Sequence, residues 1–267
     1  GGDEGPATEA AFGSPHDVSV DSRGRIVITD SRHGRIRRVD EEGVVHNLAG
    51  TAFMWDKGDG GPSVSASLYH VQSVAHGPGD DVYIGDAIGR IRRIDDATGI
   101  ITTVVGTGIQ GYTGDGGPAV EAKIGAPSAI RFDAAGSLYF SDTANHVIRV
   151  VDTNGTISTV AGTGQPGFAQ DGTPATEAAL DTPWGLAVSP DGQIFVSDSM
   201  NNRVRRITPG GAIETVAGSE NPGDAGDGGP ATSARLNEPH GLCLLGDDVL
   251  LICDNFNNRI RAVRLQS

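Results

Sequence analysis

Three histidines are the residues of this chain whose type and spacing best suit metal binding. His16 and His240 each follow a proline, in the segments SPHDV and EPHGL, and His70 lies two residues before the matching position of another segment. Neutral imidazole nitrogens bind Zn²⁺ and other borderline divalent ions, so their convergence would predict a metal site of a metal-assisted lyase or hydrolase. Isolated histidines at a polar rim more often only form hydrogen bonds. The sequence requires no cofactor, and zinc is the metal that it could hold.

The two proline–histidine segments belong to a position that recurs along the chain and varies in residue type. Its occupants are His16, Gln72, Ser128, Trp184 and His240. A tryptophan there can stack on a sugar, a peptide side chain or a cation, or pack against a neighbouring loop. Arg131 interrupts a position otherwise held by small residues, and it would need a carboxylate such as Asp17 or a bound anion. We predict that these five residues and Arg131 form a ligand-binding surface.

The usual catalytic signatures are missing from the sequence. It contains no GxSxG, HExxH, CxxC or Walker segment. Carboxylates are plentiful, but most recur in every repeat, and a residue needed several times is a poor candidate for a unique acid or base. The sequence therefore favours a binding protein, and leaves open whether the chain is an enzyme.

A regular period positions these candidates. Asp30, Asp86, Asp142, Asp198 and Asp254 lie 56 residues apart, each at the end of a short apolar run such as IVITD or IFVSD. Short β-branched runs bounded by turn residues predict strands. In one repeat, strands are expected at 184–189, 194–198, 203–207 and 213–218, joined by hairpin turns. A long period with four strands per unit predicts a β-propeller blade.

The repeat runs through the whole chain and predicts a single domain over residues 1–267. The units span approximately residues 1–56, 57–112, 113–168, 169–224 and 225–267. We expect an all-β propeller with five four-stranded blades, of which the last lacks its outer strand. The alternative is that the chain forms part of a six-bladed ring.

Positions that stay constant in the repeats predict architecture rather than function. Arginine recurs in the third strand (Arg37, Arg92, Arg149, Arg205, Arg261), and aspartate recurs in the loop before the first strand (Asp3, Asp59, Asp115, Asp171, Asp227). These charges are expected to form arginine–carboxylate bridges. The apolar position Val18, Val74, Ile130, Leu186 and Leu242 is expected to pack blade against blade. The aspartates at the ends of the second strands are expected to bond the turn that follows.

The repeated segments resemble the NHL-repeat family of β-propellers. The likeness rests on TVAGTG followed by GDGGPA, and on LYFSDTANHVIRVVD and IFVSDSMNNRVRRI, and it covers all five repeats. It implies blades around a central channel and commonly a binding role, with a minority of enzymes. The proline–histidine setting also resembles the zinc-binding histidines of peptidyl-α-hydroxyglycine α-amidating lyase, a six-bladed relative. That carry-over reaches His16 and His240 only, since the third position would be Ser128.

Composition limits the partners. The net charge of −14 argues against nucleic acid and anionic membranes, which attract clustered Lys and Arg. No stretch approaches 18 apolar residues, so we expect a soluble protein without membrane insertion, with an extracytoplasmic location left open. The expected partner is a protein, a peptide or a carbohydrate, bound at the mouth of the central channel and on the loops between blades. The open edge of the last blade also offers a route to self-association.

Two smaller features complete the sequence pattern. Cys243 and Cys253 would lie diagonally across a hairpin, so two buried thiols are expected in place of a disulfide. Met54 and Trp55 predict an apolar patch on a loop, either a contact surface or a packed connection.

Overall fold

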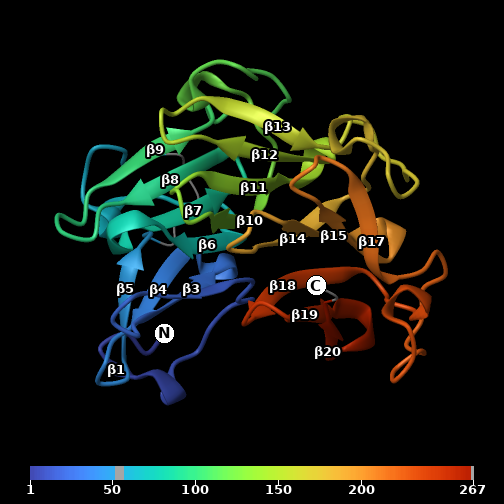
Figure 1. The fold of residues 1–267 in the computed structure, drawn as a ribbon. Coiled ribbons are helices and arrows are strands. Elements are labelled where there is room, and N and C mark those ends of the chain that lie inside the picture. The colour runs from blue at the N-terminus through green and yellow to red at the C-terminus, as the bar shows by residue number, and fades with distance from the viewer. Residues whose placement is uncertain (52–56, 266–267) are drawn as a thin grey trace. The chain divides into compact units, whose positions relative to one another are not determined.

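The structure, a computed structural model, describes residues 1–51 and 57–265. The predicted patch at Met54 and Trp55 lies outside these described residues. The chain divides into two compact units, residues 1–130 and 131–267. Within the described ranges, every helical piece is a three-residue 3-10 turn and the rest of the regular structure is strand (Figure 1). The predicted all-β class is confirmed.

The first unit contains two antiparallel sheets. The first has the order β1-β5-β4-β3-β2 and consists of β1 (Gly5–Pro6), β2 (Val18–Val20), β3 (Ile26–Asp30), β4 (Arg35–Val39) and β5 (Val44–Ala49). The second has the order β6-β7-β8-β9 and consists of β6 (Ser73–His76), β7 (Val82–Asp86), β8 (Arg90–Ile94) and β9 (Ile101–Val105). The two-residue β1 is not predicted by the sequence; it pairs with the outer strand of its own blade.

The boundary between the two units falls within β10 (Pro127–Phe132), the first strand of the third sheet, and the second unit is otherwise built in the same way. The sheet β10-β11-β12-β13 continues with β11 (Leu138–Asp142), β12 (Val147–Val151) and β13 (Ile157–Ala161). The next comprises β14 (Pro183–Val188), β15 (Ile194–Asp198), β16 (Arg203–Ile207) and β17 (Ile213–Gly218). The last comprises β18 (Pro239–Leu245), β19 (Val249–Asp254) and β20 (Arg259–Arg264). Among the described residues this blade has three strands, as expected.

The 3-10 turns occupy two recurring places. Five follow a loop proline before the first strand of a blade: η1 (Ala7–Glu9), η3 (Ser63–Ser65), η5 (Ala119–Glu121), η7 (Ala175–Glu177) and η9 (Ala231–Ser233). Four join the second strand to the third: η2 (Ser31–His33), η6 (Thr143–Asn145), η8 (Ser199–Asn201) and η10 (Asn255–Asn257). A further turn, η4 (Pro78–Asp80), precedes β7. Each kind of turn recurs at the same place in successive repeats because the repeat has a fixed length.

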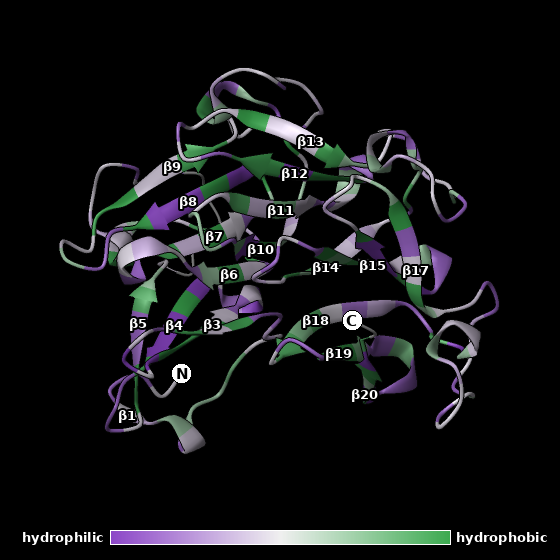
Figure 2. Cartoon of the chain, viewed as in Figure 1, coloured by the Kyte–Doolittle hydropathy of each residue, from purple (hydrophilic) through white to green (hydrophobic). Residues whose placement is uncertain are grey.

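Apolar strand residues form the core of each unit. Hydrophobic colouring is concentrated on the strands, while the connecting loops are mostly pale or hydrophilic (Figure 2). Val74 is buried in a cluster with Val27 and Ile36 of the preceding blade, as predicted for its position. Val18 is 56% exposed, so the packing prediction is wrong there. It belongs to the first blade, which has no preceding blade within its unit.

The repeated arginine joins each blade to the loop that precedes it. The guanidinium of Arg205 lies 3.1 Å from Asp171 and 3.5 Å from Asp198, with its side chain fully buried. It also donates to the carbonyl of Ala169 in the loop. Equivalent pairs to the loop aspartate are formed by Arg37, Arg92 and Arg261. In these four repeats the predicted arginine–carboxylate bridges are confirmed.

The aspartate at the end of the second strand tethers two turns at once. Asp198 accepts hydrogen bonds from the amide of Asn201 (2.9 Å) and from the backbone N–H of Asp181 (2.7 Å). Asp254 does the same with Asn257 and the N–H of Asn237. The expected bond to the following turn is confirmed, and a second bond holds the entry to the first strand. Burial raises the pKa of Asp198 to about 6, although these hydrogen bonds and Arg205 act to lower it.

Three residues of the TVAG signature have distinct structural tasks. In β17, Thr215 binds Asp171 through both its N–H (3.0 Å) and its hydroxyl (2.9 Å). Val216 is skipped by the pairing between β16 and β17, so it forms a β-bulge and packs on the core. Gly218 has φ +89 and approaches the carbonyl of Asn202 too closely for a side chain. The same bulge precedes the repeated arginine in each of the four blades whose outer strand is described.

The cysteines are not joined by a disulfide, as expected. Cys243 pairs with Leu251, the register predicted for the hairpin. The expectation that both thiols are buried is wrong, because Cys243 is exposed and Cys253 is only partly buried.

Candidate functional site

The variable position lies at the start of the first strand, where neighbouring blades touch within each unit. In the first unit, the hydroxyl of Ser128 donates to the side-chain oxygen of Gln72 at 3.1 Å. Ser128 is only 4% exposed, so that hydroxyl is largely committed to its neighbour. The variable residues of adjacent blades therefore face each other in this unit, even though they lie 56 residues apart in the sequence.

In the second unit, the same position brings two rings together. Trp184 of β14 and His240 of β18 are stacked, with ring centroids 4.4 Å apart and planes within 3°. Both side chains are partly exposed. The sequence leaves open whether Trp184 faces a ligand or packs on a neighbour; here it packs on the imidazole of the next blade and keeps an exposed portion. Paired flat rings of this kind offer an apolar platform with polar edges.

The backbone beneath this platform is tightly held. The hydroxyl of Ser197 donates to the carbonyl of His240, and Ser199 donates to the carbonyl of Pro239 at 2.6 Å. At Gly185 a Cβ would lie 2.0 Å from the His240 carbonyl oxygen, so only glycine allows β14 and β18 to come this close. The two rings are therefore positioned by close packing of two neighbouring strands.

Two further apolar side chains lie at the same end of these blades. Pro183 pairs with Asp198 and Pro239 pairs with Asp254, so each first strand begins beside the end of its second strand. The 3-10 turns that follow these aspartates carry Met200 (51% exposed) and Phe256 (59% exposed), and both residues hydrogen-bond through their N–H to the loop before the first strand. Exposed apolar side chains gathered at one end of neighbouring blades are typical of contact surfaces.

The other predicted residues are described within their own units. His16 is exposed at the entry to β2, and its N–H donates to the hydroxyl of Thr29. His70 is exposed at a left-handed position (φ 44) and packs edge-on against Tyr69. Arg131 is half-buried at the start of the second unit. Asp17, its suggested partner, belongs to the first unit and accepts the N–H of Val74 at 3.1 Å.

The metal hypothesis stays a prediction. His16 and His70 belong to the first unit and His240 to the second. Over residues 1–51 and 57–265, no three or more His, Cys, Asp or Glu side chains are grouped to hold a metal ion. Elemental analysis of purified protein before and after zinc titration tests the hypothesis: stoichiometric zinc that is lost on His240→Ala supports it, and no bound or rebound metal contradicts it.

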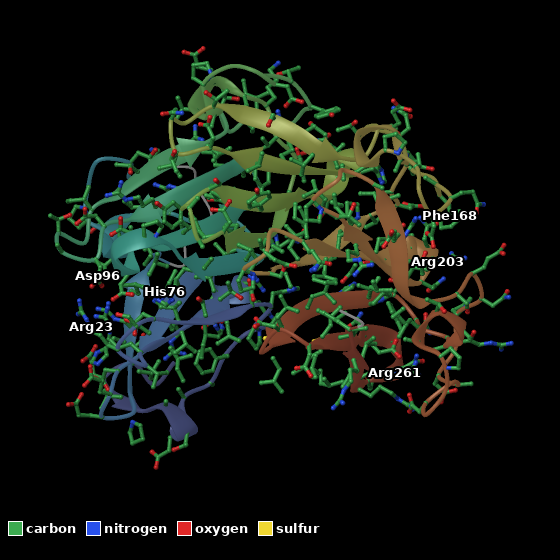
Figure 3. All side chains as sticks on the ribbon, in the orientation of Figure 1. Arg23, His76, Asp96, Phe168, Arg203 and Arg261 are labelled. Atoms are coloured by element: carbon green, nitrogen blue, oxygen red, sulfur yellow. The ribbon has the colours of Figure 1, made fainter. Side chains whose placement is uncertain are left out.

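A charged cluster in the first unit is balanced internally. The carboxylate of Asp96 lies 3.0 Å from Arg25, 3.1 Å from Arg38 and 3.4 Å from Arg23, across the boundary between the first two blades (Figure 3). Nearby, burial lowers the pKa of His76, which shares a 3.0 Å hydrogen bond with a serine hydroxyl. Because the arginines are paired with carboxylates, this cluster ties two blades together and is a poor anion site.

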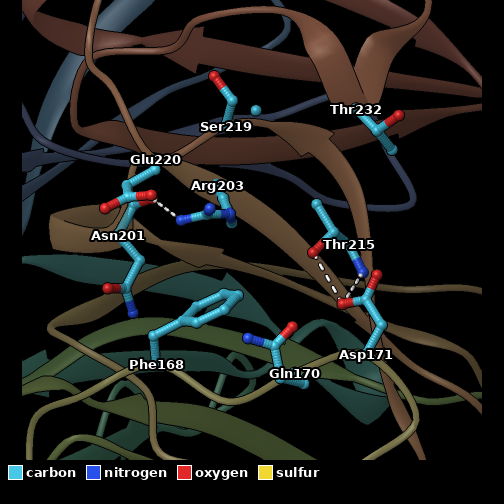
Figure 4. A pocket seen from close by; sticks show the side chains of 10 residues that line it. Phe168, Gln170, Asp171, Asn201, Arg203, Thr215, Ser219, Glu220 and Thr232 are labelled. Atoms are coloured by element: carbon cyan, nitrogen blue, oxygen red, sulfur yellow. Dashed lines mark hydrogen bonds between the residues drawn. The ribbon is translucent and has the colours of Figure 1, made fainter.

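A hollow of the second unit is not predicted by the sequence reasoning. It has a volume of about 740 Å³ and lies between the outer strands of the β14–β17 blade and the loop that leads to β18 (Figure 4). Phe168, Arg203 and Glu220 line it. A signal is present in the sequence: the loop position of Phe168 holds Tyr112 one repeat earlier and Asp224 one repeat later. That variation is easily overlooked because the loop lies far from the entry to the first strand.

A smaller hollow lies at the opposite end of the same blades. It encloses about 370 Å³ and is lined by the turn residues Asp191, Asp247 and Asp248, with Arg206 and Phe195. The carboxylate of Asp191 is already engaged by Ser189 and Gln193. The Asp191 carboxylate therefore serves mainly to hold the turn.

Comparison with known sequences identifies the repeat. The model of the NHL repeat matches residues 12–39 and 180–207, and that of the teneurin NHL domain matches residues 108–168. Teneurin-4 of Mus musculus is 28% identical over 279 residues, covering 90% of this chain and 10% of its own length. Teneurin-1 of Mus musculus is 30% identical over 231 residues, covering 78% of this chain and 8% of its own length. The chain thus spans about a tenth of the length of these relatives.

Solved structures share the fold. An auxiliary nutrient binding protein from Bacteroides ovatus superposes with a TM-score of 0.71 at 20% identity, covering 97% of this chain and 60% of that one. A virginiamycin B lyase from Staphylococcus aureus superposes with a TM-score of 0.55 at 18% identity, covering 97% of this chain and 72% of that one. At such identities the likeness concerns the fold alone. In the described part of the chain, no helix is long and apolar enough to cross a membrane.

Proposed function

Because the chain is an NHL-repeat β-propeller, we propose that it is a non-enzymatic binding scaffold for a protein or peptide, with its contact surface at the entries to the first strands. In the second unit this surface is centred on the stacked rings of Trp184 and His240. The same position holds histidine in two repeats and glutamine, serine or tryptophan in the others, whereas the position two residues later is apolar in every repeat. Variation on a constant frame is what a recognition surface requires.

The stacked pair is the observation that carries the proposal. Tryptophan is enriched among the residues that dominate binding energy, because it covers a large area with few rotatable bonds. Its ring is already held by the imidazole 4.4 Å away, so little side-chain freedom is left to be lost on binding. The exposed side chains of Met200 and Phe256 extend the apolar surface at the same end of the blades.

The comparisons support a binding role in general terms. Proteins that share the fold include an auxiliary nutrient binding protein as well as a lyase, and the sequence relatives are teneurins. The excess negative charge of −14 favours partners with neutral or basic contact surfaces.

Selection of displayed peptides tests this function. Immobilised protein is used to enrich a peptide library, and the enriched peptides are then titrated against wild type, Trp184→Ala and His240→Ala. We expect the variants to bind about tenfold or more weakly, the effect of losing a central aromatic contact. Val120→Ala is the matched control, since it removes an exposed apolar side chain from another loop. Failure to enrich any peptide, or equal binding by the Trp184 and Val120 variants, would refute the proposal.

A further inference from the structure

The hollow lined by Phe168 in the second unit is built mainly from residues that recur in the repeats, such as Asp171 and Asn201, but Phe168 itself occupies its loop position in one repeat only. Asn201 of η8 donates from its amide to the buried Asp198 and, at 2.7 Å, to the carbonyl of Gly167. In the next repeat Asn257 holds the carbonyl of Gly223 in the same way, at 2.6 Å. The constant aspartate and asparagine thus fix the loop glycine, and the residue after it is presented at a defined place.

The presented residue differs between the two repeats, and the difference decides whether a site is open. In the last repeat it is Asp224, whose carboxylate lies 3.3 Å from the guanidinium of Arg259. In the preceding repeat it is Phe168, with the guanidinium of Arg203 lying 4.3 Å from the ring centroid. An ion pair closes the first arrangement. The second leaves an aromatic ring 40% exposed beside a guanidinium that has no carboxylate within ion-pair distance among the described residues.

The other groups around Phe168 are suited to hydroxyl groups. The side chains of Gln170, Ser219, Glu220 and Thr232 line the hollow, and none makes a hydrogen bond within the described ranges 1–51 and 57–265. Asp171 is already held by Thr215 and Arg205, so it is rigid but keeps acceptor capacity. An aromatic ring surrounded by amide, hydroxyl, carboxylate and guanidinium groups matches the alternating C–H and O–H surfaces of a sugar.

Charge and size define the ligand class more closely. The lining holds Arg203, Asp171 and Glu220; Asp171 is paired with the buried Arg205, whose guanidinium lies 4.9 Å from the Phe168 ring centroid, and the net charge of the protein is −14. An anionic ligand is therefore disfavoured. The volume of about 740 Å³ lies within the range of small-molecule sites and is open along the loop. We propose that this hollow, which we call the Phe168 pocket, binds a neutral saccharide, with ring C–H groups against Phe168 and hydroxyls toward Arg203 and Glu220.

An array of neutral oligosaccharides of glucose, galactose, mannose and xylose provides the test, followed by calorimetric titration of the best-bound member. We expect wild type to bind at least one of these sugars. Phe168→Asp should weaken binding by about tenfold or more, because it removes the aromatic contact and places a carboxylate next to Arg203. That substitution recreates the Asp224–Arg259 arrangement of the last repeat, so the variant is expected to fold; its melting temperature and circular dichroism verify this.

Two controls locate the site. Tyr112→Ala removes the aromatic residue at the same loop position one repeat earlier, where the third strand begins with Val147 instead of arginine, and it should retain full binding. Trp184→Ala, which weakens the proposed peptide surface, should also retain full binding of the sugar. No binding to any sugar on the array, unchanged binding by folded Phe168→Asp, or equal loss in Tyr112→Ala would each overturn the proposal. Preferential capture of peptides by the Phe168 pocket would also overturn it.

Discussion

Replacing Gly218 by alanine should destabilise the protein much more than the same replacement at Gly211 in the same repeat. Gly218 ends β17 with φ +89, and a Cβ there would lie 2.2 Å from the carbonyl oxygen of Asn202 and 2.9 Å from the Cα of Arg203. Asn202 itself has φ 53 and closes η8, so its carbonyl cannot retreat without displacing the start of β16. Gly211 has φ +80, but no atom lies within 4 Å of its Cβ position.

Alanine in a left-handed conformation lowers the stability at both sites, and a clash with the backbone lowers it further at Gly218 only. A left-handed alanine costs roughly 1–2 kcal/mol, partly offset by about 0.4–1 kcal/mol because alanine restricts the unfolded chain. Gly211→Ala should therefore lower the free energy of unfolding by about 1 kcal/mol. At Gly218 the backbone overlap adds about 1–3 kcal/mol, typical of an overpacked site, for a total of about 2–4 kcal/mol.

Thermal unfolding followed by circular dichroism measures the difference. With about 2–4 °C of melting temperature per kcal/mol for a chain of this size, Gly218→Ala should melt roughly 4–16 °C lower than wild type and Gly211→Ala roughly 2–4 °C lower. Urea unfolding supplies the free energies independently. Equal shifts for the two variants would show that the close approach of β17 to η8 carries no strain, and the reasoning would fail.

Three further predictions concern charge and the open edge. Arg205→Met should lower the free energy of unfolding by about 3–5 kcal/mol at pH 7.5, because it leaves the buried carboxylate of Asp198 without its ion-pair partner. The loss should be smaller at pH 5, where Asp198, with a pKa of about 6, is largely neutral. Equal losses in urea unfolding at both pH values would contradict this. Hydrogen bonds to the carboxylates of Asp40 and Glu4 raise the pKa of His46. The protonated imidazole therefore stabilises the folded protein, by at most about 1 kcal/mol at this partly exposed site. This stabilisation is complete below pH about 6.5 and is lost as the pH rises through the raised pKa. The melting-temperature difference between wild type and His46→Gln should accordingly shrink from pH 5.5 to pH 9, and a constant difference would count against it. Finally, light scattering should detect self-association of wild type through β20, reduced by Ile260→Lys at its exposed face, and a strict monomer at all concentrations would exclude that contact.

Much of the fold is predictable because each repeat supplies its own comparison. The four strands of the fourth repeat are expected at 184–189, 194–198, 203–207 and 213–218, and the structure places them within one residue of those bounds. The bridge between Arg205 and Asp171 is also predicted, since both charges recur with the period. Residues that recur must satisfy the same local geometry each time, so their spacing alone reveals their role.

The candidate sites are predictable only in part. The variable position identifies Trp184 and His240, but nothing in the sequence indicates that the two rings stack. The sequence reasoning misses the Phe168 pocket, although Tyr112, Phe168 and Asp224 form a second variable position. Its formation depends on a loop of one repeat, a third strand of the same repeat and a loop of the next repeat meeting in space.

The sequence by itself determined the all-β architecture, the strand order within each blade and the paired Arg205 and Asp171, because these follow from local hydrogen bonding, alternation and spacing. Only the tertiary structure decided which variable residues touch. The stack of Trp184 on His240 arises where neighbouring blades pack, and the exposed ring of Phe168 lies beside Arg203 where a loop meets the third strand of its own blade. Side-chain contacts across a blade boundary depend on the twist and separation of two sheets, to fractions of an ångström, and no local pattern records those quantities.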